Sequence, residues 1–262
     1  MIDLHCHLLP GIDDGATDLE VSLAMARSAI AGGVDAIVAT PHVSWTYAND
    51  PATFPSRVAE VQAAITAAGL PLQVLTGAEV AYGTLPELSE ESLRACVLGG
   101  GKYLLLEPPY NGPVPFIDQA IARLRSRGYR VLLAHPERIG AFQRDLGLLE
   151  TLVEGGCLCS VTASSVAGAF GRSVTAFTRE LFARGLVHNL ASDAHDAGSR
   201  SPALRRLLDE AVAAMPELED HLDWLTVAAP RAIVSGQAPP GETPRIASKR
   251  GFLARIRRTR GL

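Results

Sequence analysis

The sequence predicts an α/β fold, a distorted seven-stranded β/α barrel of the TIM-like type. Short apolar stretches rich in β-branched residues alternate with Ala- and Leu-rich segments of helical spacing, as in a parallel sheet covered by helices. Successive strand centres are about 27–38 residues apart, the size of one β/α unit. No Gly-x-Gly-x-x-Gly fingerprint follows the first strand, which disfavours an open dinucleotide-binding sheet.

The elements follow one another in a regular order. The predicted strands, each a short apolar run, are Met1–His5, Asp35–Thr40, Gln73–Ala78, Tyr103–Glu107, Arg130–Ala134, Leu158–Thr162 and Val187–Ala191. The predicted helices, each Ala- and Leu-rich with helical spacing, are Asp18–Ala31, Ser56–Ala68, Pro115–Arg127, Gln143–Glu154, Ser173–Arg184 and Pro202–Ala214. Seven such units in one domain fit a barrel better than an open, doubly wound sheet.

The chain has 262 residues, which is long enough for one domain with a substantial core. No boundary is visible before about Gly236, so residues 1–235 are predicted to form a single barrel domain. The segment Gly236–Pro244 is rich in Pro and Gly, as linkers are. Residues 236–262 are therefore predicted to be a linker followed by a basic tail.

Charge is distributed unevenly along the chain, whose formal net charge is −4. The stretch Arg245–Leu262 has seven basic residues and no acidic one, and the remainder has 17 basic against 28 acidic residues, a balance of −11. An acidic body argues against a general nucleic-acid binder. The tail is typical either of a solvated terminus or of a segment that touches an anionic membrane surface or a partner protein.

The sequence also indicates a cytoplasmic protein. It lacks any run of about 18 apolar residues, which excludes a transmembrane helix. Its first residues lack the basic region and apolar stretch of a signal peptide. The four cysteines show no Cys-x-x-Cys spacing, so we expect them to be reduced thiols.

Side chains of the types that bind metals gather at the predicted strand ends. The first strand ends in His5-Cys6-His7, whose two imidazoles are two residues apart and therefore face the same side. Asp13-Asp14-Gly15 follows shortly afterwards. Because a β/α barrel builds its active site at the carboxyl ends of its strands, these side chains are expected to meet there. The corresponding residues of later strands are His42, Glu79, Glu107, His135, Asp193 and His195.

A metal cluster accounts for this set better than separate structural roles. Glu79 and Glu107 end strongly apolar runs, where a buried carboxylate is costly unless a metal or a salt bridge neutralises it. Nitrogen and carboxylate ligands without a thiolate suit Mn²⁺, Fe or Zn²⁺ better than Ca²⁺ or a structural zinc site. The candidates are too many for one ion, which predicts a cluster with a bridging carboxylate. His188, expected in the core or in a supporting role, and His221, expected on a helix surface, fall outside the pattern.

Other hydrolase chemistries lack their sequence signatures. No cysteine is followed six residues later by arginine, which excludes the phosphate loop of thiolate phosphatases. The chain also has no Gly-x-Ser-x-Gly elbow and no Gly-x-x-x-x-Gly-Lys loop. Metal-dependent hydrolysis of a phosphoester is therefore the chemistry that the residues favour.

At these positions the sequence resembles the polymerase and histidinol phosphatase (PHP) superfamily. The similarity lies in His5-Cys6-His7 with Pro10–Gly15, Thr40-Pro41-His42, Gly77-Ala78-Glu79, Ala134–Arg138 and Ala191–His195. The Asp-Asp-Gly segment and His135-Pro136-Glu137-Arg138 are similar to the bacterial tyrosine-protein phosphatases of capsule and exopolysaccharide synthesis. The match covers residues 1 to 235 in motif order.

This resemblance implies a PHP-type barrel with three divalent ions, for which Mn²⁺ is the leading candidate and Fe or Zn²⁺ the alternatives. The implied ligands, ion by ion, are His5, His7, Glu79 and Asp193; then Glu79, Glu107 and His135; then Asp14, His42 and His195. Many superfamily members have histidine where Glu107 stands, so this carboxylate is expected to alter the metal preference. Asp13 is an alternative to Asp14, and spacing alone does not choose between them.

Arg138 and Arg200 are the predicted catalytic residues. Three divalent ions would leave an excess of positive charge that attracts phosphate, and fork-shaped guanidinium groups suit its oxygens. The alternative for either arginine is a surface salt bridge.

The resemblance implies a metal-dependent phosphatase that acts on phosphotyrosine. Its expected partner is a membrane-associated tyrosine autokinase that controls capsule or exopolysaccharide synthesis, which would place the protein in the cytoplasm or at the inner membrane surface. One alternative within the superfamily is a small-molecule phosphatase, such as one acting on histidinol phosphate, or a nuclease. The alternative of another class is a non-catalytic, metal-bound module that recognises phosphorylated protein.

Overall fold

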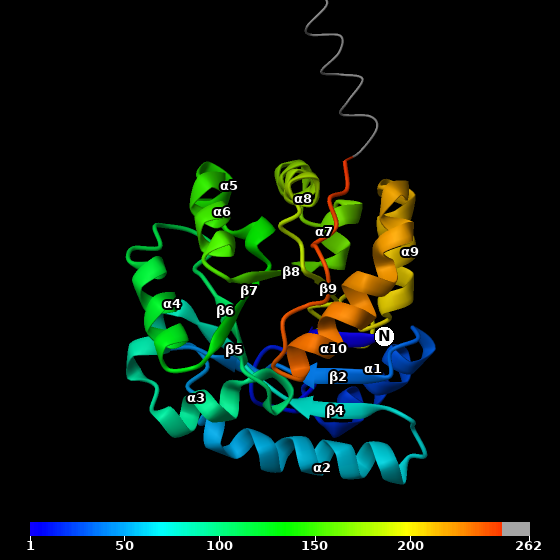
Figure 1. Ribbon diagram of the computed structural model, residues 1–262. Coiled ribbons are helices and arrows are strands. Elements are labelled where there is room, and N and C mark those ends of the chain that lie inside the picture. Colours follow the sequence, from blue (N-terminus) through cyan, green and yellow to red (C-terminus); the bar gives the residue numbers. More distant parts are fainter. Residues whose placement is uncertain (248–262) are drawn as a thin grey trace, which may run out of the picture.

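The computed structural model, which describes residues 1–247, has the predicted α/β architecture, with parallel strands inside and helices outside (Figure 1). One sheet has the strand order β1-β2-β4, and the other has the order β3-β5-β6-β7-β8-β9. The first comprises β1 (Ile2–Cys6), β2 (Ala36–Ala39) and β4 (Gln73–Thr76). The second comprises β3 (His42–Val43), β5 (Glu79–Ala81), β6 (Tyr103–Glu107), β7 (Arg130–Ala134), β8 (Leu158–Thr162) and β9 (Asn189–Ala191).

The second and third predicted strands correspond to β2 and β4, and each is followed, after a break, by a further short strand that was not predicted. Pro41, which has no amide hydrogen for a strand ladder, lies between β2 and β3. Gly77 lies between β4 and β5, and a Cβ there would come within 2.6 Å of Val38 Cγ1, so only glycine fits. Beyond these breaks His42 and Glu79 begin β3 and β5, and the register pairs them with each other.

The two sheets meet at the end of β1. Cys6 forms a parallel bridge with Ala194, and the His7 N–H donates to the Ala194 carbonyl at 2.8 Å. The Asp193 N–H donates to the His5 carbonyl at 2.9 Å. A continuous ladder does not form here because β9 is short and Asp193 takes a left-handed backbone conformation with φ 51°. In residues 1–247 the paired strands form two sheets and not one closed sheet, so the closed seven-stranded barrel stays a prediction.

Six helices correspond to the predicted ones. They are α1 (Leu19–Ala31), α2 (Phe54–Ala67), α4 (Ile117–Ser126), α6 (Leu146–Glu154), α8 (Arg172–Arg184) and α9 (Leu204–Ala214). The predicted helix Gln143–Glu154 begins inside a separate short helix, α5 (Gly140–Arg144), because Asp145 ends α5 and caps α6 by accepting from the Leu148 N–H.

The remaining helices are short, which is why their spacing gave no signal. They are α3 (Glu90–Cys96), α7 (Ala163–Ala167) and α10 (Ala229–Val234). There are also short 3₁₀ segments at Pro51–Thr53, Tyr82–Glu87 (η2), Leu98–Gly100, Pro136–Arg138 (η4) and Pro216–His221, and a π segment at Trp224–Ala228. Within residues 1–247, no helix has the length and apolar character needed to cross a membrane.

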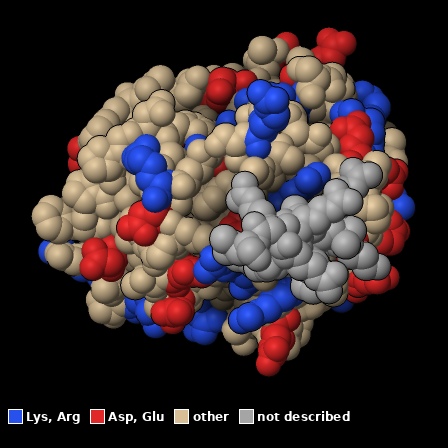
Figure 2. All heavy atoms as spheres, turned by 90° about the horizontal axis from the view of Figure 1, so that it is seen from above, with Lys and Arg blue, Asp and Glu red and all other residues tan. Residues whose placement is uncertain are grey.

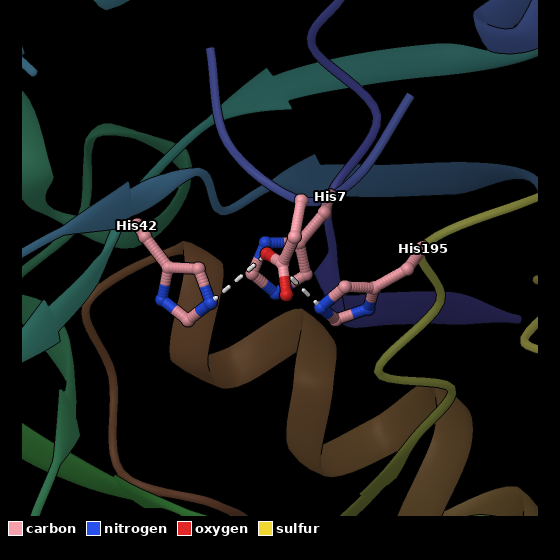
Figure 3. A group of neighbouring side chains, drawn as sticks. His7, His42 and His195 are labelled. Carbon is pink, nitrogen blue, oxygen red and sulfur yellow. Dashed lines mark ion pairs between the residues drawn. The ribbon is translucent and has the colours of Figure 1, made fainter. Parts of the chain in front are cut away.

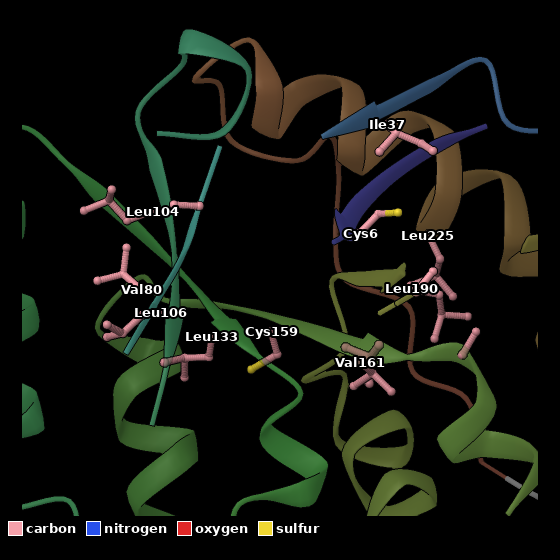
Figure 4. Packing of buried hydrophobic residues seen from close by; sticks show 14 of the residues in the cluster. Cys6, Ile37, Val80, Leu104, Leu106, Leu133, Cys159, Val161, Leu190 and Leu225 are labelled. Carbon is pink, nitrogen blue, oxygen red and sulfur yellow. The ribbon is translucent and has the colours of Figure 1, made fainter. Parts of the chain in front are cut away.

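Alternate residues of the central strands pack into different layers. On β6, Leu104 and Leu106 join the larger apolar cluster, and Figure 4 shows Leu106 near Leu133. Tyr103 and Leu105 belong to a smaller, separate cluster. Glu107 lies on the same face of β6 as Tyr103 and Leu105, so its carboxylate is directed away from the layer that the helices cover.

The segment after α10 stays in contact with the domain. The Trp224 indole donates to the Pro240 carbonyl at 2.8 Å, and the Ile246 N–H donates to the Phe182 carbonyl at 2.9 Å. The domain limit at residue 235 stays a prediction. Residues 248–262, which hold most of the predicted basic tail, lie outside the described residues. On the face shown in Figure 2, basic and acidic side chains are interspersed.

Candidate metal centre

The structure brings every predicted metal-binding side chain to one place at the carboxyl ends of the strands. Their nitrogen and carboxylate atoms form four overlapping groups, and within each group all ligand atoms lie within 4.8 Å of one another. Figure 3 shows the imidazoles of His7, His42 and His195 pointing toward one another. The residues in these groups are His5, His7, Asp14, His42, Glu79, Glu107, His135, Asp193 and His195.

Glu79 lies at the middle of the cluster and is almost completely buried. Its Oε1 is 2.8 Å from His135 Nε2, and its Oε2 is 3.2 Å from His5 Nε2. The same Oε2 is 3.4 Å from His7 Nε2 and 3.2 Å from His42 Nδ1. One carboxylate therefore faces four imidazoles with both oxygens, which is the arrangement of a bridging ligand.

Two further carboxylates complete the buried part of the cluster. Asp193 Oδ1 lies 3.5 Å from His5 Nε2 and 3.7 Å from His195 Nδ1. On the other side, Glu107 Oε1 lies 3.6 Å from His135 Nε2. These acidic side chains come from β6 and from the loop after β9, so the cluster depends on the sheet order and not on one local segment.

The structure distinguishes the two adjacent aspartates that spacing left open. Asp14 Oδ1 lies 3.4 Å from His42 Nε2 and 3.5 Å from His195 Nε2. Asp13 instead pairs with His7 Nδ1 at 2.9 Å and accepts the His42 N–H at 3.0 Å. Asp14 thus faces the other candidate ligands, whereas Asp13 orients His7 so that its Nε2 points into the cluster.

The pKa values of the cluster indicate crowded charges. Burial and the nearby negative charge of Glu79 raise the pKa of Glu107 to about 8. Burial opposes protonation of His7, but its contacts with Asp13 and Glu79 outweigh it and raise its pKa to about 10. Burial and the positive charge of His7 lower the pKa of His195 to about 3. Carboxylates and imidazoles that shift one another's pKa values at such short distances are suitable ligands for divalent cations. Such cations would neutralise the carboxylates.

Asp3 and Ser192 form a buried hydrogen-bonded pair next to the ligand residues His5 and Asp193. Asp3 accepts the Ser192 N–H at 3.1 Å and the Ser192 hydroxyl at 2.5 Å, and it also accepts the His5 N–H at 3.3 Å. This pair joins β1 to the strained turn at Asp193. Asp3 was not among the predicted site residues, although it lies two residues before His5 on the same strand face.

A cavity of about 220 Å³ opens beside the cluster. Its lining comprises Asp14, His42, Glu79, Glu107, Tyr110, Arg138, Asp193, His195 and Arg200. Arg138 Nη1 donates to Asp193 Oδ2 at 2.7 Å, and Arg200 Nη2 donates to the same oxygen at 3.0 Å. Both predicted arginines therefore make a salt bridge and also line this cavity.

Aromatic rings hold parts of this wall in place. The Arg138 guanidinium lies 4.2 Å from the ring centroid of Phe170 and 4.9 Å from that of Tyr110. The Tyr110 ring also stacks on His135, with centroids 5.2 Å apart and an interplanar angle of 9°. Phe170 lies between α7 and α8, far from every motif in the sequence, and no local pattern predicted its role.

Comparison with known proteins places these features in a family. A family model described as capsular polysaccharide synthesis, CpsB/CapC, matches residues 1–233. The chain is 37% identical to tyrosine-protein phosphatase YwqE of Bacillus subtilis, over 77% of this chain and 80% of the relative. It is 31% identical to putative tyrosine-protein phosphatase CapC of Staphylococcus aureus, over 85% of this chain and 88% of the relative.

A solved structure agrees with these relatives. It belongs to a crystallographic study of YwqE from Bacillus subtilis and CpsB from Streptococcus pneumoniae, described as metal-dependent tyrosine phosphatases. The match has a TM-score of 0.82 and 33% identity, and it covers 95% of this chain and 100% of the other. From the family model, the relatives and this structure together, the chain belongs to the CpsB/CapC family of capsular polysaccharide synthesis proteins.

Proposed function

We propose that this protein is a metal-dependent protein-tyrosine phosphatase of capsule or exopolysaccharide synthesis. The observation that carries the proposal is the convergence of five imidazoles and four carboxylates, most of them buried, beside two arginines. Relatives that share at least 31% of their residues with this chain are named tyrosine-protein phosphatases, one of them as putative. A module that only binds phosphoprotein would not require so many converging metal-type ligands.

The residues present fit a cluster of three divalent ions, with Mn²⁺ preferred and Fe or Zn²⁺ as alternatives. When bound, the ions supply Lewis acidity toward the phosphate oxygens and the attacking water. Glu79 would be shared between ions, because its two oxygens face different imidazoles. The proposed ligands are those of the cluster, namely His5, His7, Asp14, His42, Glu79, Glu107, His135, Asp193 and His195.

The arginines would bind the phosphate of the substrate. A guanidinium has five N–H groups, and the contacts of Arg138 and Arg200 with Asp193 use only part of them. The remaining donors can take phosphate oxygens at the cavity wall. A tyrosine leaving group has a pKa of about 10, so its departure needs less proton donation than that of an alkyl alcohol.

The proposal also covers the partner protein, the location in the cell and the closure of the barrel. The proposed partner is a membrane-associated tyrosine autokinase, and the proposed location is the cytoplasm or the inner membrane surface, with the basic tail touching the membrane or the partner. The bridge of Cys6 to Ala194 supports a seven-stranded barrel that closes between β1 and β9. We also propose residues 1–235 as a single domain.

The test compares three substrates in parallel: a phosphotyrosine peptide, histidinol phosphate and single-stranded DNA, each with Mn²⁺ and with chelator. We expect metal-dependent turnover of the peptide. Much faster turnover of histidinol phosphate or DNA would replace the tyrosine assignment, and chelator-resistant hydrolysis would exclude the metal mechanism. Replacing His5 and His7 with alanine should abolish turnover, whereas the matched change His221→Ala, outside the cluster, should not.

A further inference from the structure

An apolar groove of about 360 Å³ lies between the segments that follow β5 and β6. One wall is η2, the 3₁₀ segment Tyr82–Glu87, and the other is formed by Phe116 and the first turns of α4. Its lining is mainly apolar, with Arg123 at one side. Nothing in the proposed chemistry of phosphate transfer uses this groove.

The groove and the metal centre share their supporting strands. η2 follows β5 directly and begins three residues after Glu79. Ala81 at the end of β5 lies opposite Glu107 at the end of β6, and the chain from Glu107 leads to Phe116. Both walls therefore leave the carboxyl ends of strands that carry cluster residues, which places the groove on the face where the cavity opens.

The walls are fixed to their neighbours. The Tyr82 hydroxyl donates to the Pro115 carbonyl at 2.5 Å and ties one wall to the other. The Trp45 indole donates to Glu87 Oε1 at 3.2 Å, and its ring covers Gly83 so closely that a Cβ there would lie 2.9 Å from it. The groove is thus preformed, and a ligand need not order it.

Two aromatic side chains at this groove are unusually exposed. Phe116, which lines it, is 70% exposed, and Trp45, which covers Gly83, is 71% exposed. Among the large apolar side chains of residues 1–247, these two have the greatest exposure. Phe116 also keeps a left-handed backbone conformation, with φ 58°, that is unfavourable for a bulky residue. Exposed apolar area and retained strain at one place are typical of a binding surface.

We propose that this groove binds an apolar side chain in the polypeptide segment next to the phosphotyrosine of the substrate. The cavity of about 220 Å³ can take the phosphorylated ring, but the chain on either side must lie on the surrounding face. In an extended chain, a residue two positions away lies about 7 Å further on. Because the groove and the cavity both lie beyond the carboxyl ends of β5 and β6, the segment that flanks the phosphotyrosine is the occupant, and the apolar lining favours an apolar side chain. This inference rests on the proposed function and names its substrate class.

The test uses the full chain loaded with Mn²⁺ and two synthetic peptides with the same phosphotyrosine. One peptide has leucine at the two positions on each side of the phosphotyrosine, and the other has serine there. We expect roughly tenfold lower KM for the leucine peptide, because one buried leucine side chain contributes about that factor or more. The variant Phe116→Ser removes one wall, and Ala120→Trp fills the groove; both should remove the preference.

Turnover of p-nitrophenyl phosphate separates the groove from the metal centre, because this small substrate cannot reach beyond the cavity. Both groove variants should leave its kcat and KM unchanged. Leu19→Ser removes another exposed apolar side chain, 43% exposed and outside the groove lining, and should leave the peptide preference intact.

Three kinetic outcomes would overturn the inference: equal KM for the two peptides, a preference that survives both variants, or equal losses on peptide and p-nitrophenyl phosphate. The oligomeric state of both variants is also measured in the absence of peptide. If it differs from that of the wild type while the KM for peptide is unchanged, the groove binds a second copy of this chain, and the inference is also overturned. A wild-type protein that hydrolyses neither peptide would instead refute the proposed function.

Discussion

Replacing Phe170 with alanine should weaken phosphate binding through Arg138. The Arg138 guanidinium is sandwiched between the rings of Phe170 and Tyr110, and the Phe170 centroid is the nearer one at 4.2 Å. One of its nitrogens is anchored on Asp193 at 2.7 Å, and the two rings restrict the rest of the group. Phe170→Ala removes one ring and leaves the salt bridge in place.

The size of the effect follows from the burial of the contact. Arg138 is 16% exposed and Phe170 is 36% exposed, so the pair lies between the surface and buried limits of a cation–π contact, about 0.5 to 2 kcal/mol. We expect about 1 kcal/mol, which corresponds to a roughly fivefold change in affinity. Because the arginine would hold the phosphate in both the ground state and the transition state, the loss should appear in KM and leave kcat nearly unchanged.

The assay measures kcat and KM for p-nitrophenyl phosphate and the inhibition constant of inorganic phosphate. Phe170→Tyr keeps the ring and should behave as wild type. In an Arg138→Ala background, Phe170→Ala should have no further effect, since its route of action is gone. The reasoning is refuted if Phe170→Ala changes neither constant, or if it has the same effect with and without Arg138.

The other predictions concern stability and metal binding. Burial lowers the pKa of His188 to about 4, below its ordinary value of 6.5, so only the unfolded chain takes up this proton between those pH values. The free energy of unfolding should therefore fall by up to about 3 kcal/mol from pH 6.5 to 4, and urea titrations of His188→Gln should lack that part of the fall. Asp3→Asn should lower the free energy of unfolding by about 2–3 kcal/mol and Ser192→Ala by about 1–2 kcal/mol in urea denaturation, because buried donors or acceptors lose their partners. Mn²⁺ binding at pH 7 should release protons, detectable with a pH indicator, because the raised pKa values of His7 and Glu107 keep both groups protonated in the metal-free protein; proton-neutral binding would contradict this.

Much of the fold was predictable because it is repetitive. The β/α alternation located the strand regions and six helices, since each element is long enough to show its own spacing. The breaks after β2 and β4 were not predicted, although Pro41 and Gly77 both mark them. Their cause is partly tertiary, because the close approach of Val38 to Gly77 appears only when β2 and β4 are paired.

The predicted site residues were found from their places at strand ends, where barrel geometry brings distant segments together. Spacing did not separate Asp13 from Asp14, because adjacent residues differ only in where the loop turns them. It also gave no sign of Phe170, whose contact with Arg138 depends on how the loop between α7 and α8 folds back. Sequence pattern thus predicted the residues with metal-type chemistry and missed Asp3 and Phe170, which support them.

The most direct test of the account measures bound metal and phosphotyrosine turnover in the same samples as chelator is added stepwise. We predict that turnover of a phosphotyrosine peptide falls together with metal content, returns when Mn²⁺ is restored, and is absent from a Glu79→Gln variant. Full turnover of the peptide by metal-free protein would contradict it.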